Sequence, residues 1–254
     1  MTGSHDKKLA ECVTSVSSGP SNANASNRAA KLRDFAIPVI ILILATFIIA
    51  VTDADLKLAA LFCIDGKWPI GAEQPWRLLY LLDRGPAISL ALCGLAAAII
   101  GRFNRQRRSW IRPGLFLVIL LALGPGLIVN SVFKEYWGRP RPREIVQFGG
   151  KKEFLHPWQK GVAHMGRSFP SGHASAAFYL SAPFFLLRRR KPGTASLWMA
   201  GGLIFGCLMS VARITQGGHF LSDNLWAWGM VHLTAVSLYY LLRLDRDETS
   251  SQES

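Results

Sequence analysis

The chain has 254 residues, of which half are hydrophobic and 18% are charged. This composition is too apolar for a disordered chain. Lysine and arginine number 29 against 16 aspartates and glutamates, and the formal charge of +13 predicts an anionic partner such as nucleic acid, a phosphorylated substrate or a lipid surface. The four cysteines show no CxxC spacing, so neither a disulfide framework nor a zinc site is indicated.

The predicted elements begin with a polar tail. Residues 1–34 are rich in Ser, Asn, Ala and Lys and contain no apolar run, which indicates a disordered cytoplasmic tail rather than a signal peptide. The seventeen residues from Phe35 to Val51 carry no charge and reach the lower limit of about 17 to 25 for a membrane-spanning helix. Comparable apolar segments follow at about 86–100, 114–133, 174–187, 195–212 and 220–242. The sequence therefore predicts an all-α bundle of six transmembrane helices over residues 35–242, followed by a second cytoplasmic tail at 243–254.

The basic residues indicate how this bundle lies in the membrane. Five arginines without an acidic residue separate the second and third predicted spans, and the run Arg188–Lys191 follows the fourth. Cytoplasmic loops of membrane proteins collect Lys and Arg, so these segments are predicted to face the cytoplasm. Residues of about 134–173 then lie on the opposite side, yet they carry eight basic residues against three glutamates. Binding of a multiply anionic substrate would account for this exception.

Nucleic-acid binding and transport have less support in the sequence. No zinc-finger spacing, RNA-recognition signature or soluble basic helix is present, so no nucleic-acid partner is expected. No internal repeat is evident, which disfavours an inverted-repeat transporter.

Two motifs on the predicted non-cytoplasmic side are typical of phosphate binding. In KEYWGRPRP, two Arg-Pro steps favour extended backbone and spread the cationic side chains of Lys134 and Arg141 over a surface. In SFPSGHAS, Ser171 is suited to cap a helix, and Gly172 lets the backbone approach a ligand closely. A helix start of this kind binds phosphate.

A third motif, RITQGGHFLSD, contributes Arg213, His219 and Asp223. The histidine and the aspartate are four residues apart at the start of the last predicted span, so they share one face of a helix. The three motifs are therefore expected to meet at one surface of the membrane.

Together the three motifs resemble the type 2 phosphatidic acid phosphatase superfamily, membrane lipid phosphatases related to the vanadium haloperoxidases. The family pattern is Lys-x6-Arg-Pro, then Pro-Ser-Gly-His, then Ser-Arg-x5-His-x3-Asp, and its order and internal spacings are kept between Lys134 and Asp223. One position departs, because Ala212 stands where the family usually has serine. The predicted spans exclude a soluble haloperoxidase relative, and the setting of the loop 148–158 resembles bacterial lipid A phosphatases.

The resemblance and the chemistry of phosphate hydrolysis assign the same roles. The reaction requires cations around the phosphate oxygens, an in-line nucleophile and an acid for the leaving oxygen. His219 is expected to attack phosphorus and form a phosphohistidine, Asp223 to fix its tautomer, and His173 to act as general acid and then base. The expected phosphate-binding residues are Lys134, Arg141, Ser171, Gly172 and Arg213. No metal or other cofactor is expected, because three cations already converge and a divalent ion would be repelled.

The predicted function is hydrolysis of a phosphate ester or anhydride of a membrane lipid, with lipid A, undecaprenyl diphosphate, phosphatidylglycerophosphate and phosphatidic acid as candidate substrates. A lipid phosphotransferase with the same intermediate and a non-catalytic binder of lipid phosphate remain as alternatives. Lys151 and Lys152 are candidates for contact with a second phosphate or a glycan. The expected location is the bacterial inner (plasma) membrane, with the site facing the periplasm or exterior. No obligatory protein partner is expected.

Overall fold

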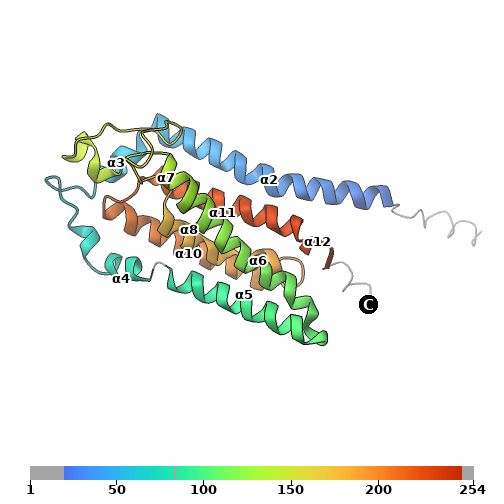
Figure 1. Cartoon of the computed structure of the whole chain (residues 1–254). Helices are drawn as coiled ribbons and strands as arrows, with labels where there is room; N and C mark the ends of the chain where they lie inside the picture. Colours follow the sequence, from blue (N-terminus) through green and yellow to red (C-terminus); the bar gives the residue numbers. More distant parts are fainter. Residues whose placement is uncertain (1–19, 83, 248–254) are drawn as a thin grey trace, which may run out of the picture.

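A computed structural model describes residues 20–82 and 84–247 of the chain. This part is helical, as predicted, with the long helices side by side (Figure 1). The α-helices are α2 (Pro20–Val51), α3 (Ala54–Ala60), α4 (Trp76–Leu81), α5 (Gly85–Phe103), α6 (Ile111–Leu121), α7 (Lys134–Tyr136), α8 (Gly172–Phe178), α9 (Pro183–Leu187), α10 (Pro192–Thr215), α11 (Leu221–Leu241) and α12 (Leu244–Asp247). The other helical segments are η1 (Ile70–Ala72), η2 (Arg105–Trp110), the π-helical η3 (Ala122–Phe133), η4 (Pro142–Glu144), η5 (Val146–Phe148) and η6 (Tyr179–Ser181).

Four stretches of helix among the described residues are long and apolar enough to cross a membrane. They are Arg28–Val51, Trp76–Phe103, Arg105–Tyr136 and Pro192–Thr215. These stretches contain the first, second, third and fifth predicted spans. The predicted spans at 174–187 and 220–242 do not meet the criterion, so the prediction of six membrane-spanning helices is confirmed only for four.

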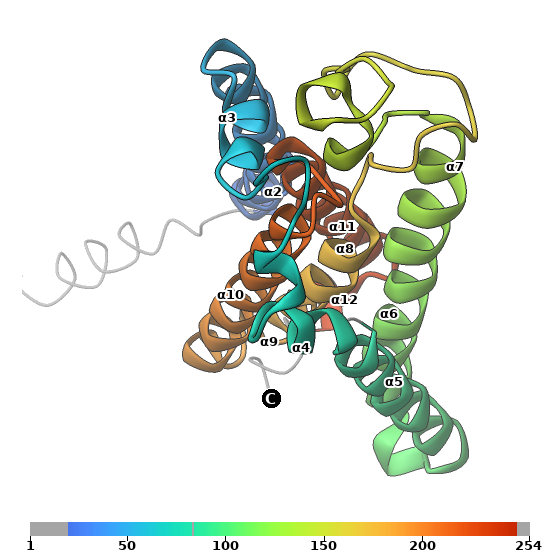
Figure 2. The ribbon, with the colours of Figure 1, turned by 90° about the vertical axis from the view of Figure 1, so that its left-hand side faces the viewer.

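The two remaining segments are helical but enclosed by protein. The broken helix of α8, η6 and α9 lies at the centre of the bundle, packed against α10, α11 and η3 (Figure 2). α11 is 21 residues long, but its first turn contains the buried polar residues Ser222, Asp223 and Asn224. Polar groups at such positions are tolerated because neighbouring helices shield them from lipid. These are the helices that carry the second and third motifs.

The arginine-rich segments and the three motifs lie at opposite ends of the bundle. The segment between α7 and α8 and the short helices α3 and α4 gather at one end, whereas η2 and the α9–α10 turn lie at the other (Figure 1). At this other end Arg188 forms an ion pair with Asp34 of α2 at 2.7 Å, and Arg189 donates to the backbone carbonyl of Asp245 at 3.0 Å. The arginine-rich segments predicted to be cytoplasmic therefore share one end, opposite the three motifs.

Helix α2 begins at Pro20, inside the segment 1–34 that the composition predicts to be a disordered tail. The first helix is thus longer than the predicted span. Ala, Lys and Arg favour helix, and residues that extend an existing helix need no new nucleus. α12 likewise falls in the predicted tail 243–254. The rest of the two predicted tails, 1–19 and 248–254, lies outside the described residues.

A proline widens the third span before it reaches the site. Pro125 lacks an N–H and obstructs the preceding turn, and the helix is π-helical around it. The side-chain amide of Asn130 donates to the carbonyl of Pro125 at 2.6 Å. This bond orients Asn130 one turn before Lys134, at the end of the span that faces α8.

Candidate active site

His219 lies in the turn between α10 and α11. Its N–H and that of Gly218 donate to the carbonyl of Arg213 at 3.3 and 3.0 Å, so the turn holds the histidine close to the end of α10. The side chain is 1% exposed, and its Nδ1 is 2.6 Å from the carbonyl oxygen of Ser168. A carbonyl only accepts, so the proton lies on Nδ1 and Nε2 keeps its lone pair. Nε2 is buried without a hydrogen-bond partner among the described residues.

Asp223 supports this histidine in a different way from the one predicted. Its Oδ2 lies 3.7 Å from Nδ1 of His219 and accepts hydrogen bonds from Ser168 Oγ at 2.6 Å and Phe220 N at 2.8 Å. The nearest acceptor for Nδ1 is therefore the Ser168 carbonyl. This geometry is compatible with the expected tautomer, and the carboxylate contributes a negative charge near the ring.

A buried arginine joins Asp223 to α3. Arg139 donates from Nη1 to Asp223 Oδ1 at 2.5 Å and to Ser222 Oγ at 2.8 Å, and from Nη2 to Asp55 Oδ2 at 2.8 Å. Asp55, in α3, also accepts from the N–H of Ser222 at 2.8 Å. The side chains of Arg139 and Asp223 have no exposed surface, and that of Asp55 is 4% exposed. The network fixes the start of α11 beneath His219.

Helix α8 starts as the SFPSGHAS motif predicts. Ser171 caps it, because its Oγ accepts from the N–H of Ala174 at 3.4 Å. A Cβ atom at Gly172 would collide with Asn130 Oδ1 and lie 3.0 Å from Lys134 Nζ. Lys134 also donates to Asn130 Oδ1 at 3.5 Å. Glycine at this position therefore lets the ammonium group approach the first turn of the helix.

The remaining predicted residues line a cavity of about 390 Å³. Arg141 reaches it from the segment after α7, where the extended backbone predicted for the Arg-Pro steps is present with φ −80° and ψ 157°. Arg213 reaches it from the last turn of α10, and His173 from the start of α8. Lys134 is close enough to repel both arginines. Two of the predicted cations, Arg141 and Arg213, therefore line one space, and Lys134 lies near them.

His173 contacts an aromatic residue that the motifs do not contain. Its ring stacks on that of Tyr80 in α4, with centroids 4.9 Å apart and planes inclined by 20°, and the guanidinium carbon of Arg213 lies 5.1 Å from the Tyr80 ring centroid. Burial and the nearby charges of Arg213 and Lys134 lower the pKa of His173 to about 2. Burial also lowers the pKa of His219 to about 3, despite the opposing effect of Asp223. Both imidazoles are therefore neutral at pH 7.

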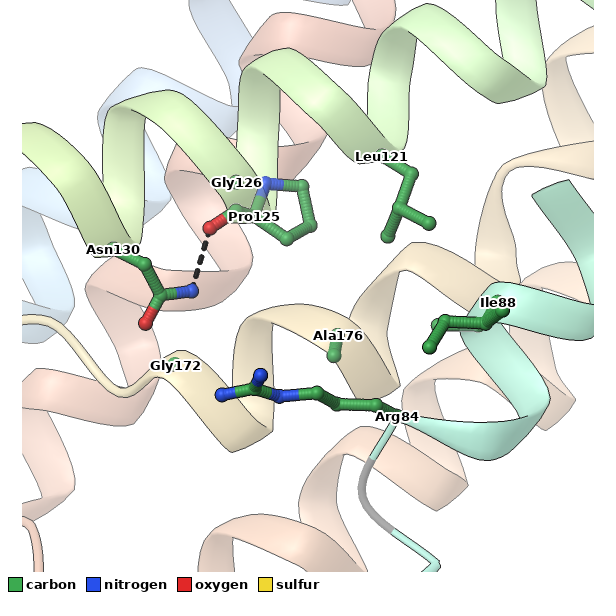
Figure 3. Close-up of a pocket in the computed structure, with 9 residues that line it drawn as sticks. Arg84, Ile88, Leu121, Pro125, Gly126, Asn130, Gly172 and Ala176 are labelled. Atoms are coloured by element: carbon green, nitrogen blue, oxygen red, sulfur yellow. Dashed lines mark hydrogen bonds between the residues drawn. The ribbon is translucent and has the colours of Figure 1, made fainter.

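A second cavity, of about 180 Å³, lies on the other side of the start of α8. Apolar side chains such as Ile88 and Leu121 line it, and the side chain of Arg84 extends toward Gly172 (Figure 3). Gly172 lines this cavity and His173 lines the first. The start of α8 therefore separates a polar cavity from a mainly apolar one.

The structure also shows the surroundings of Lys152 and Ala212. Lys152 pairs with Glu144 at 3.0 Å, and neither Lys151 nor Lys152 lines the two cavities described above. Ala212 is fully buried, so the position where the family usually has serine is filled by a methyl group inside the bundle.

Several residues of the site region were not among the predicted site residues: Asp55, Tyr80, Asn130, Arg139 and Ser168. Asn130 contacts Lys134 from one turn earlier in the same span, whereas the others reach the site through the tertiary fold. Ser168 opens the SFPSGHAS motif, which was used only for the helix start. Arg139 stands in a recognised Arg-Pro repeat, which marks its segment but not its buried role. The others are single polar or aromatic residues beside apolar runs. No group of three or more His, Cys, Asp or Glu side chains suited to a metal occurs within the described ranges, and the metal-free reaction stays a prediction.

Comparison with known proteins relates this chain to lipid phosphatases. The model of the PAP2 superfamily matches residues 113–246, more than half of the chain. Lipid A 4'-phosphatase of Francisella tularensis subsp. novicida (strain U112) is 35% identical over 157 residues, which cover 61% of this chain and 68% of that protein. Lipid A 4'-phosphatase of Rhizobium leguminosarum is 34% identical over 152 residues, which cover 59% of this chain and 62% of that protein, less than two thirds of its length.

A solved structure shares the fold. The transmembrane PAP2 type phosphatidylglycerolphosphate phosphatase from Bacillus subtilis superposes with a TM-score of 0.50 at 20% sequence identity, over 83% of this chain and 94% of that one.

The fold and the site define a helical membrane protein with cations gathered around a neutral, buried histidine. The match to the superfamily model and the identity to the Francisella protein show that the chain belongs to the PAP2 superfamily. The resemblance expected from the three motifs is confirmed, and with it the class of PAP2-type lipid phosphatase.

Proposed function

We propose that the protein hydrolyses the phosphate ester of a phosphorylated membrane lipid of the lipid A type through a covalent phosphohistidine on His219. The observation that carries this proposal is Nε2 of His219, a buried nitrogen with a fixed lone pair and no partner among the described residues. Lys134 and Arg213 are close enough to act on its charge. A phosphate group is negatively charged at its oxygens and electrophilic at phosphorus, so it suits both features.

In the first proposed step the histidine displaces the lipid. The phosphate oxygens accept hydrogen bonds from Lys134, Arg141 and Arg213 and from the first N–H groups of α8. The Nε2 lone pair of His219 attacks phosphorus, an N–P bond forms, and the P–O bond to the lipid breaks. His173 passes the proton of the substrate's phosphate monoanion to the leaving oxygen, while the cations stabilise the charge on the equatorial oxygens.

In the second proposed step water displaces the histidine. His173, which is neutral, removes a proton from water and passes it on to the departing phosphate, and the resulting oxygen nucleophile attacks phosphorus. The N–P bond breaks, its electron pair returns to Nε2 of His219, and inorganic phosphate is released. During the intermediate the imidazole is positively charged. The Asp223 carboxylate, 3.7 Å from Nδ1, stabilises this charge, and the Ser168 carbonyl keeps the ring in position.

The choice of lipid follows the relatives at higher identity. Both relatives described above are lipid A 4'-phosphatases, which favours a phosphorylated glycolipid over undecaprenyl diphosphate, phosphatidylglycerophosphate or phosphatidic acid. The Bacillus subtilis structure, at 20% identity, bears on the fold alone.

The proposal includes the side of the membrane on which the reaction occurs. The arginine-rich η2 and α9–α10 turn lie at the end of the bundle opposite the site. Under the positive-inside rule that end faces the cytoplasm, so the site faces the periplasm or exterior of a bacterial inner membrane.

A panel assay tests the proposed function. Detergent-purified protein is incubated with the four candidate lipids, and inorganic phosphate and phosphorylated lipid products are quantified. We expect phosphate release, fastest from phosphorylated lipid A. Transfer of the phosphoryl group to a second lipid, with no inorganic phosphate, would indicate the phosphotransferase instead. Binding of all four lipids without turnover would indicate the non-catalytic alternative.

A further inference from the structure

We propose that the cavity of about 390 Å³ is a subsite for the sugar ring that carries the substrate's phosphate. This inference rests on the proposed function and deepens it, because it assigns residues to the part of the substrate beyond the phosphate. The volume falls in the range of about 300 to 1,000 Å³ usual for small-molecule sites.

The cavity continues directly from the phosphate-binding residues. Arg141, His173 and Arg213 form one part of its lining, and Trp68, from the segment between α3 and α4, forms another. A group esterified to a phosphate at this position therefore extends either into this cavity or into the one beyond Gly172. The second cavity is lined mainly by apolar side chains, so a sugar fits the first better.

One residue of the lining, Trp68, carries a hydrogen-bond donor without an acceptor among the described residues. The indole N–H of Trp68 is buried and has no hydrogen-bond partner among the residues that the structure describes. A buried N–H is normally paired, so an oxygen of a bound ligand is its natural acceptor. Arg143 also lines the cavity and lies close enough to Arg141 to repel its charge. Sugar hydroxyl and ring oxygens provide acceptors for both groups.

This part of the cavity is built before a ligand binds. Gln216 donates to the carbonyl of Gly71 at 3.2 Å and accepts a hydrogen bond from Arg213, which ties the segment carrying Trp68 to the phosphate site. Trp68 packs edge-on against Phe148, with ring centroids 5.6 Å apart. Trp68 and Tyr80 add aromatic side chains to a lining that is otherwise mainly polar.

The substitution Trp68→Phe tests the subsite, because it removes the N–H and keeps an aromatic ring against Phe148. The measurement is the ratio of kcat/KM for a lipid with a hexosamine-linked phosphate to kcat/KM for phosphatidic acid with the same acyl chains. The ratio should fall roughly three- to tenfold, the loss of one hydrogen bond. Arg143→Gln should lower it too. Trp158→Phe is the matched control, since Trp158 is exposed and lines neither cavity, and it should leave the ratio unchanged.

The outcomes separate the subsite from the proposed function. An unchanged ratio in both Trp68→Phe and Arg143→Gln would overturn the subsite, and so would an equal fall for the two lipids. Wild-type turnover of phosphatidic acid without the glycolipid would also overturn it, while the phosphatase activity stands. If neither lipid is hydrolysed, the proposed function fails. Calorimetric titration with a water-soluble hexosamine phosphate then tests the subsite alone: weaker binding to Trp68→Phe supports it, and equal affinity overturns it.

Discussion

Arg139 and Asp223, 84 residues apart in the chain, form a fully buried ion pair with 2.5 Å between Nη1 and Oδ1. The same guanidinium binds Asp55, so three separate segments are joined beneath His219. The second oxygen of Asp223 accepts from Ser168 and from the N–H of Phe220. The nucleophilic histidine of the proposed mechanism thus rests on a network that only the tertiary fold assembles.

Removal of Arg139 should destabilise the protein strongly. Arg139→Ala leaves two buried carboxylates without their counter-ion, a loss of about 3–5 kcal/mol, and should lower the Tm in detergent by roughly 10 °C. Arg167→Ala is the control, because Arg167 pairs with Glu135 from a half-exposed position and such pairs contribute about 0–1 kcal/mol. Equal changes in Tm for the two variants would contradict the structural role of the buried pair.

The lowered pKa values of the histidines predict the pH dependence of kcat/KM. His219, with a pKa of about 3, keeps its lone pair until the pH falls through that value. His173, with a pKa of about 2, brings no proton of its own at neutral pH, so the proton arrives with a phosphate monoanion whose second pKa is about 6. The value of kcat/KM should therefore be constant between about pH 4 and 6, where His219 is neutral and the phosphate is a monoanion. Above about pH 6 the monoanion loses its proton, and kcat/KM should fall about tenfold per pH unit. A limb that rises with pH near 6.5 would indicate a histidine with an ordinary pKa.

Vanadate should inhibit, and chelators should not. Vanadate adopts the five-coordinate geometry of phosphorus in the transition state, and Lys134, Arg141 and Arg213 are arranged to stabilise that charge. The inhibition constant should lie at least about a hundredfold below the KM, as for transition-state analogues in general. Loss of activity in a chelator that a divalent ion restores would overturn the metal-free mechanism.

Cysteine labelling tests the orientation in the membrane. Lys151→Cys, in the loop at the site end, and Gln106→Cys, in η2 at the opposite end, place thiols at exposed positions in a background without the native cysteines. In whole cells with a permeable outer envelope, Lys151→Cys should react with a membrane-impermeant maleimide, and Gln106→Cys only after lysis. The reverse pattern would place the site in the cytoplasm.

The residues with chemistry were predictable where they stand in local motifs. Ser171 and Gly172 start a helix because of their own backbone preferences. The four-residue spacing does bring His219 near Asp223, but the prediction that they share a helix face was wrong, because α11 begins at Leu221 and His219 lies in the turn before it. The four apolar helices were predictable from length and composition. α11 was predicted as a membrane span but does not meet the criterion of length and hydropathy. Its first turn contains polar residues that neighbouring helices bury, and a hydropathy pattern contains no information on such packing.

The supporting residues were not predictable, because their partners are distant in the chain. Asp55 meets Arg139, and Tyr80 meets His173, only after the helices have packed. The Ser168 carbonyl that fixes the tautomer of His219 is a backbone group, which leaves no mark in the sequence. Local patterns therefore indicated the reacting groups, whereas the groups that orient them required the fold.

The phosphohistidine on His219, on which the proposed mechanism depends, is tested most directly by trapping the intermediate. Protein is mixed with a lipid carrying radiolabelled phosphate, quenched in alkali within one turnover, and digested for mass spectrometry. We expect label on the peptide that contains His219 in the wild type, and no label in His219→Ala. Label on another residue, or turnover by the wild type with no labelled protein at any time, would contradict the mechanism.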